Sequence, residues 1–228
     1  MKHIPRIYTN KQLFENAIIT VDFDTTHHLL NVLRINDGGH IKLFNAEYGE
    51  WDAICDVRKK DINIVVQTLI KEPTVEVGFT VIFALIVPSK MHIILEKATE
   101  LGAAQFYPII TEYTQNKSFN LTKAETIVRN AAEQCGRLSV PIVHNSISLK
   151  NLLSMWPENV QITVGDLCDN YDTNPLNRES CFLIGPEGGF SVADREMFAK
   201  YKFIKTIQIA NNILRAETAA VAFSALCR

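Results

Sequence analysis

The chain beyond residue 78 alternates between short apolar runs and helical patterns, and this alternation restricts the fold to few classes. Phe79–Val87 is an almost continuously apolar run, as expected of a buried parallel strand, and Pro88 then begins a helix that Gly102 closes. We therefore expect an α/β domain with a mostly parallel sheet. Further strands are predicted at Gln105–Ile110, Val160–Val164, Cys181–Ile184 and Thr206–Ile209, and further helices at Leu121–Cys135, Leu149–Met155, Ser191–Tyr201 and from Arg215 or Ala216 to Cys227.

The first seventy residues have a different pattern, in which short β-type runs are separated by turn residues such as those at 36–39. A helix from Thr25 or Thr26 to Arg34 interrupts them, with Leu29, Val32 and Leu33 predicted on one face. This pattern favours a small β-barrel, and Pro73 marks a linker after it. We expect two domains, residues 1–72 and 73–228. The strands are predicted at Arg6–Tyr8, Ile18–Asp22, His40–Phe44, Trp51–Val57 and Ile62–Leu69.

The composition excludes several classes of protein. A net charge of -2 with 47% hydrophobic residues is that of a folded globular chain. The longest apolar run is far shorter than the ~20 residues that span a bilayer, and the start lacks a secretory signal, so we expect a cytoplasmic protein. Five widely spaced cysteines without a C-x-x-C pair indicate neither a disulfide framework nor a metal site. Residues 1–72 carry 9 basic and 10 acidic side chains and residues 73–228 carry 14 and 15, so charge alone does not indicate a nucleic-acid partner.

The segment from Leu183 to Ser191 joins a buried strand to a helix through three glycines and a proline. In open α/β sheets, ligands bind at the carboxyl ends of strands, and glycines allow backbone N–H groups to approach a ligand closely. The loop matches no phosphate-binding motif, and Pro186 and Glu187 favour a neutral or cationic ligand instead. The alternative is a tight turn without a ligand.

Two further segments carry charged residues next to helices. Arg215 and Glu217 stand at the start of a final helix of small and apolar residues, where charges are costly unless paired or used in function. The alternative is a structural Arg–Glu pair. Gly136 and Arg137 follow the helix at 121–135, and by themselves indicate capping of that helix.

Together these segments resemble one known family, the RsmE family. The resemblance rests on EQCGR at 133–137, GPEGGFS at 185–191 and ILRAETA at 213–219, in that order. PRIY at 5–8, His28 with VLR at 32–34 and KATELG at 97–102 also agree with it, so it covers essentially the whole chain.

The resemblance implies an enzyme that uses S-adenosylmethionine to methylate N3 of one uridine in 16S ribosomal RNA of the small ribosomal subunit. It implies that residues 73–228 form an α/β domain of the SPOUT class with a trefoil knot, and that residues 1–72 form a PUA-like, RNA-binding β-barrel. It also implies a homodimer, without metal or membrane. The cofactor-binding residues would be Val164, Gly165, Asp166, Leu167, Ile184, Gly185, Pro186, Glu187, Gly188, Gly189, Ile209, Ala210, Asn211, Ile213 and Leu214.

By the same resemblance, Arg215 and Glu217 are candidate catalytic residues. A guanidinium suits the negative charge that develops on the uracil oxygens as N3 loses its proton, and Glu217 would orient Arg215 or take that proton. The residues expected to contact RNA are Arg6, Arg34, Lys97 and Arg137.

The chain departs from the family pattern at two places. Ala210 and Asn212 stand where a glycine and an arginine are usual, and no arginine lies near Tyr113. A catalytically weak or inactive RNA-binding or ribosome-assembly protein on the same scaffold is therefore the alternative function. A third interpretation is a SPOUT enzyme that acts on transfer RNA or another base.

Overall fold

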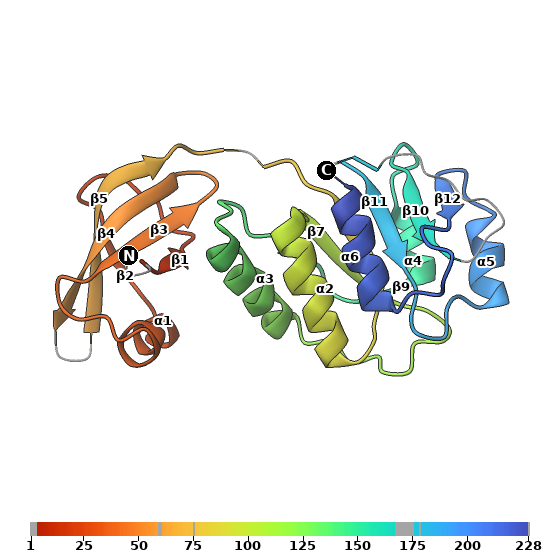
Figure 1. Cartoon of the computed structure of the whole chain (residues 1–228), viewed down its shortest axis with the longest axis horizontal. Coiled ribbons are helices and arrows are strands. Elements are labelled where there is room, and N and C mark those ends of the chain that lie inside the picture. The colour runs from red at the N-terminus through yellow and green to blue at the C-terminus, as the bar shows by residue number, and fades with distance from the viewer. Residues whose placement is uncertain (1–3, 59–60, 75, 167–175, 178, 228) are drawn as a thin grey trace. The chain divides into compact units, whose positions relative to one another are not determined.

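Figure 1 shows the computed structural model of the chain, which describes residues 4–58, 61–74, 76–166, 176–177 and 179–227. The chain forms two compact units. The first takes in the chain up to Glu76 together with Ala132–Ser139, and the second takes in Val77–Ala131 and the chain from Val140 onwards. No helix among the described residues is long and apolar enough to span a membrane.

The first unit is built on a five-stranded sheet. Its strand order is β1-β3-β4-β5-β2, in which β1 runs parallel to β3 and the other neighbours are antiparallel. All five predicted strands are confirmed, although several are longer or shorter than expected. Among the described residues, β1 and β2 are the edges and do not pair with each other, so the sheet is not closed into the expected barrel. The strands are β1 (Arg6–Tyr8), β2 (Ile18–Thr20), β3 (His40–Asn45), β4 (Gly49–Arg58) and β5 (Asp61–Lys71).

The predicted helix in this unit starts earlier than expected and changes its winding. Helix α1 (Phe23–His27) begins after Asp22, whose side chain accepts a hydrogen bond from the backbone of Thr25 at 2.7 Å. The chain then continues as the π-helical turn η1 (His28–Val32). Its wider i→i+5 turn rotates Val32 outwards, so Val32 is 61% exposed while Leu29 is buried. The prediction that Val32 shares a buried face with Leu29 is therefore wrong.

Arg6 holds segment 132–139 within this unit. Its guanidinium donates to Glu50 Oε2 at 2.7 Å and to the carbonyl oxygens of Ala132, Glu133 and Arg137 at 2.9 Å. The first two carbonyls belong to the last turn of α3 (Leu121–Cys135), where they lack helical partners. The Arg6 side chain thus caps this helix from β1.

Arg137 lies in a second buried ion pair of the same unit. Its Nε donates to Glu76 at 2.9 Å, and Glu76 also accepts from the backbone of Leu138 and from the hydroxyl of Ser139. The side chains of Arg6 and Arg137 are only 10% and 11% exposed. The structure therefore places both arginines inside the unit and not on an RNA-facing surface.

The second unit contains an entirely parallel sheet of order β12-β10-β11-β6-β7-β8, with β9 also paired to β7. The α/β prediction is confirmed. The short strands β8 and β9 were not predicted, because two residues carry no readable pattern. The strands are β6 (Thr80–Ala84), β7 (Gln105–Ile110), β8 (Ile142–Val143), β9 (Ile147–Ser148), β10 (Ile162–Gly165), β11 (Cys181–Ile184) and β12 (Ile204–Ile207).

Helices cover both faces of this sheet. Helices α2 (Pro88–Leu101) and α6 (Ala216–Leu226) lie side by side and contribute to one apolar cluster with Phe182 and Ile184 of β11. Helices α4 (Leu149–Met155) and α5 (Val192–Phe198) contribute to the other cluster, with Cys181 and Leu183. Alternate residues of β11 thus point to opposite faces, as a fully buried strand requires.

The two carboxylates of the first unit should make its stability dependent on pH. Burial alone would raise the pKa of Glu50, but the hydrogen bonds from Arg6 and Lys42 outweigh it and lower the pKa below 4.5. For Glu76, burial is likewise outweighed by hydrogen bonds from Ser139, Leu138 and Arg137, which lower its pKa. A carboxyl group with a lowered folded-state pKa stabilises the fold above its unfolded-state pKa, and this stabilisation is lost as the pH falls through the folded-state value.

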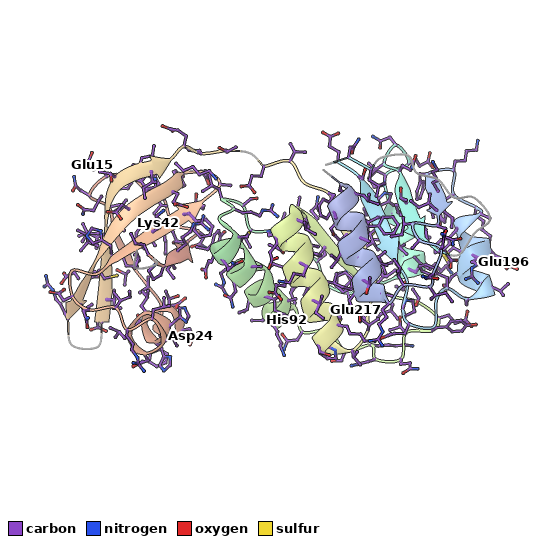
Figure 2. All side chains as sticks on the ribbon, in the orientation of Figure 1. Glu15, Asp24, Lys42, His92, Glu196 and Glu217 are labelled. Carbon is purple, nitrogen blue, oxygen red and sulfur yellow. The ribbon has the colours of Figure 1, made fainter. Side chains whose placement is uncertain are left out.

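We predict that Glu50→Gln lowers the free energy of unfolding at pH 7 by about 3 kcal/mol, because Arg6 is left buried without its anionic partner. The loss should shrink below about pH 4, where Glu50 itself becomes protonated. Chemical denaturation from pH 3 to 7 measures both effects. Glu15→Gln at an exposed position is the matched control (Figure 2) and should differ little from the wild type. An equal loss at every pH would contradict the prediction.

Candidate functional site

The loops that follow three neighbouring strands, β10, β11 and β12, surround a cavity of about 400 Å³ in the second unit. Because parallel strands end at the same edge of the sheet, segments that are far apart in the sequence meet there. The volume lies within the range of ordinary small-molecule sites. The lining residues are Gly165, Asp166, Ile184, Gly185, Pro186, Glu187, Gly188, Gly189, Phe190, Arg195, Ile207, Gln208, Ile209, Ala210, Asn212, Ile213, Leu214, Arg215, Ala216, Ala219 and Phe223.

The glycine-rich loop after β11 has a defined backbone. The N–H of Gly189 donates to the carbonyl of Pro186 at 2.9 Å, which closes a tight turn, and Gly189 has φ of +70°. Helix α5 then starts with a capping box, in which Ser191 and Asp194 each accept from the other's backbone N–H. The loop is thus fixed at its far end by the start of a helix.

The end of β10 is fixed by close packing. A Cβ atom on Gly165 would lie 2.7 Å from Cε2 of Phe223, which is fully buried on α6. Only glycine therefore allows the end of β10 to approach α6 so closely. The next residue, Asp166, is paired with Arg195 of α5 through bonds of 2.7 and 3.1 Å.

The third loop leads from β12 into α6. Gln208 donates from its side chain to the carbonyl of Ala210 at 2.8 Å, and Ile213 is 81% exposed beside the cavity. Arg215 is the N-cap residue of α6, and its carbonyl accepts the first helical hydrogen bond, from Ala219. The exposed side chain of Arg215 thus stands where the cavity meets the beginning of a buried helix.

Arg215 and Glu217 do not form an ion pair within the described part of the chain, so the simple structural explanation of these two charges fails. Figure 2 shows Glu217 at the start of α6. Its Oε2 atom is buried and lacks a hydrogen-bond partner among the described residues. Such an atom costs free energy, and in native proteins it commonly marks a site that a ligand or a proton completes.

A second ion pair lies at the glycine-rich loop. Lys90, near the start of α2, donates to Glu187 at 3.0 Å, and both side chains are partly exposed. Glu187 lines the cavity. The loop is therefore connected to α2 at its tip.

Most residues predicted to bind a cofactor line this cavity. Three do not: Val164 is buried within β10, Asn211 is exposed outside the lining, and Leu167 lies outside the described residues. The predicted catalytic residue Arg215 lines the cavity, whereas Glu217 does not. The sequence analysis missed Phe190, Arg195, Ile207, Gln208, Asn212, Ala216, Ala219 and Phe223, which read as ordinary core or helix positions.

Two predicted RNA contacts stay exposed enough to meet a partner. Arg34 follows η1 with φ of +53°, and its side chain is exposed. Lys97 of α2 is partly exposed and donates to Glu96 and Glu100 at 3.0 and 2.8 Å. These neighbouring carboxylates raise the pKa of Lys97, so it remains a cation at neutral pH.

We predict that Gly165→Ala destabilises the protein by about 1–3 kcal/mol, because its Cβ would overlap the buried ring of Phe223. Gly188→Ala is the matched control, since a Cβ there would meet Tyr113 only at ordinary contact distances of 3.6 Å or more. Thermal denaturation of both variants measures the difference. Equal melting temperatures for the two variants would show that the end of β10 has more space than the structure indicates.

Comparison with known proteins agrees with these features. A family model described as an RNA methyltransferase domain matches residues 73–228. The ribosomal RNA small subunit methyltransferase E of Rickettsia conorii is 32% identical over 223 residues, which cover 95% of this chain and 91% of that protein. The corresponding protein of Buchnera aphidicola, from Schizaphis graminum, is 30% identical, with 97% and 94% covered.

A solved structure of high similarity is the ribosomal RNA small subunit methyltransferase E of Neisseria gonorrhoeae, bound to S-adenosyl methionine. It superposes with a TM-score of 0.86 at 25% identity, over 98% of this chain and 96% of that chain. The resemblance seen in the sequence motifs is thereby confirmed. The chain belongs to the RsmE family of ribosomal RNA small-subunit methyltransferases.

Proposed function

We propose that this protein methylates ribosomal RNA of the small subunit with S-adenosylmethionine, and that the target is N3 of one uridine in 16S ribosomal RNA. The observation that carries the proposal is the cavity at the ends of β10, β11 and β12, with Arg215 beside it. Family membership supports the reaction class, and the bound cofactor of the Neisseria gonorrhoeae relative supports the cofactor.

The residues of the cavity fit this cofactor. About 400 Å³ accommodates a ligand of that size, and Ile184, Leu214 and Phe223 supply apolar walls for an adenine ring. The three glycines of the loop after β11 leave backbone N–H and carbonyl groups accessible to the polar parts of a ligand. The anionic Glu187 and the imide nitrogen of Pro186, which carries no hydrogen, would oppose a phosphate group, and they are compatible with a cation.

S-adenosylmethionine, when bound, supplies a methyl group on a sulfonium, and the departing product is the neutral thioether S-adenosylhomocysteine. The residues of the chain have to supply geometry and charge. Holding the uracil N3 atom in line with the reactive methyl group accounts for much of the rate, because positioning replaces a bimolecular encounter. Since N3 lies on the Watson–Crick edge, the base has to be unpaired when it enters the site.

Arg215 and Glu217 perform the polar steps of the proposed reaction. As N3 loses its proton and bonds to the methyl carbon, negative charge spreads to the two uracil carbonyl oxygens, and the Arg215 guanidinium stabilises it. The buried, unpartnered Oε2 of Glu217 either orients Arg215 in the assembled complex or receives the proton from N3. The two functions belong to one short segment, the first turn of α6 and its N-cap.

RNA recognition in this proposal uses both parts of the chain. Residues 1–72 would form the PUA-like, RNA-binding domain, and residues 73–228 the SPOUT domain with its trefoil knot, acting as a homodimer. After β12, at one edge of the sheet, the chain turns back to place α6 against α2 and β11, an arrangement compatible with a knot. Arg34 and Lys97 are the proposed RNA contacts, whereas Arg6 and Arg137 act by holding segment 132–139.

The test of the proposal is methyl transfer by wild type and Arg215→Ala to unmethylated small ribosomal subunits, with the methylated base identified by mass spectrometry. We expect 3-methyluridine from the wild type and a rate about 10²–10³-fold lower from Arg215→Ala, with cofactor binding retained. Arg129→Ala, at an exposed position of α3, is the control.

Three outcomes would count against this assignment. Full activity of Arg215→Ala would remove Arg215 from the mechanism, and a different methylated base would overturn the N3 assignment. A wild type that binds subunits without transferring a methyl group would favour the RNA-binding or assembly function.

We predict opposite effects of Glu217→Gln on stability and on activity. Removing a buried charge without a partner should leave the melting temperature unchanged or raise it, because the desolvation cost of the charge disappears. Methyl transfer should fall by about 10²-fold or more. Glu125→Gln, at an exposed position of α3, controls for loss of one negative charge. Unchanged activity with altered stability would assign Glu217 to structure only.

A further inference from the structure

The ion pair between Asp166 and Arg195 differs from the other ion pairs of the second unit in its geometry and position. Arg195 Nε donates to Asp166 Oδ2 at 2.7 Å and Arg195 Nη2 donates to Oδ1 at 3.1 Å, which is a bidentate arrangement. The Asp166 side chain is only 10% exposed, whereas that of Arg195 is 50% exposed. A bidentate pair fixes the plane of the carboxylate as well as its position.

Both residues line the cavity, which they reach from different elements. Asp166 is the first residue after β10, and Arg195 lies on α5, directly behind the glycine-rich loop. Most of the other lining residues are apolar or glycine, so this pair is one of the few places where the cavity wall carries side-chain charge. A charged, oriented group on such a wall is suited to select one feature of a ligand.

A carboxylate is an acceptor of hydrogen bonds, and it recognises groups that donate them. A carboxylate at the end of a strand of a parallel sheet is well suited to ribose hydroxyls, because both hydroxyls of a cis-diol can donate to it. It would repel a phosphate or a second carboxylate. Since a carboxylate can accept about four hydrogen bonds, a bidentate arginine does not exhaust it.

We propose that the Asp166 carboxylate binds the ribose hydroxyls of the cofactor, and that Arg195 is a positioning residue that holds this carboxylate in the required plane. The inference rests on the proposed function, because it assigns one part of the proposed cofactor to one wall of the cavity. Arg195 acts through Asp166 and makes no contact with the reacting atoms.

A purely structural tie between β10 and α5 predicts something different. Its loss would loosen both loops and weaken every ligand by the same factor. Direct recognition of the ribose predicts a loss confined to ligands that carry the hydroxyl. The ratio of two affinities therefore separates the two explanations, whereas a single affinity does not.

The test is calorimetric binding of S-adenosylhomocysteine and of its 2′-deoxy and 3′-deoxy analogues to the full-length protein. We expect the wild type to bind S-adenosylhomocysteine at least about tenfold more tightly than one of the deoxy analogues, as a hydrogen bond to a charged group requires. In Asp166→Ala this preference should disappear, and in Arg195→Ala it should fall severalfold. Glu196→Gln, at an exposed neighbouring position of α5 (Figure 2), should keep the full preference.

Equal affinities of the wild type for all three compounds would overturn the inference, as would an unchanged preference in Asp166→Ala. If Asp166→Ala does not fold, as judged by circular dichroism, the wild-type preference and Arg195→Ala decide the question. A preference that Arg195→Ala retains in full would remove the positioning role of Arg195. If the wild type bound no S-adenosylhomocysteine at all, the proposed cofactor itself would be wrong, so the two failures are distinguishable.

Discussion

The contact between Gly165 and Phe223 is the constraint on which the cavity depends. It brings the end of β10 against α6, the helix that follows β12, so the loops after β10 and β12 meet on either side of β11. A side chain at position 165 would separate them by the width of at least one methyl group. The cavity is therefore a consequence of one glycine that faces one buried aromatic ring.

The polar interactions around the cavity act on a smaller scale, since each fixes one loop. The pair of Lys90 and Glu187 joins the tip of the glycine-rich loop to α2, and the capping box of Ser191 and Asp194 fixes its far end. These contacts involve few side chains that a ligand would have to displace. Backbone amides fixed in this way need little reorganisation when a ligand binds, which is the usual basis of selective binding by a loop.

The sequence allowed much of the second unit to be predicted, because buried strands and capped helices have local signatures. The glycine-rich loop was predicted for the same reason, since glycines and a proline directly after a buried strand are readable in one dimension. Arg195 was missed because a charged residue in an amphipathic helix looks the same whether it faces water or a carboxylate. The order of the parallel strands is likewise invisible in a sequence, since any strand can neighbour any other.

The first unit was harder to predict, and the errors have physical causes. Arg6 and Arg137 looked like surface cations because arginine is rarely buried unless it is paired, and their partners lie far away in the sequence. The expected buried face of the first helix failed because a π-turn begins at His28. The sequence gives no sign of such a turn.

The hydrogen bonds of Arg6 to segment 132–139 have a consequence for where the chain can be divided. A fragment that begins at Pro73 would contain the whole parallel sheet, yet it would lose the donor that satisfies the carbonyls of Ala132 and Glu133. The last turn of α3 would then unwind towards the solvent, and Glu133 would also lose its bond to the backbone of Tyr8. The limits of a folded unit and the limits of a sequence segment thus differ in this protein, and proteolysis would release a shorter stable core than the linker at Pro73 suggests.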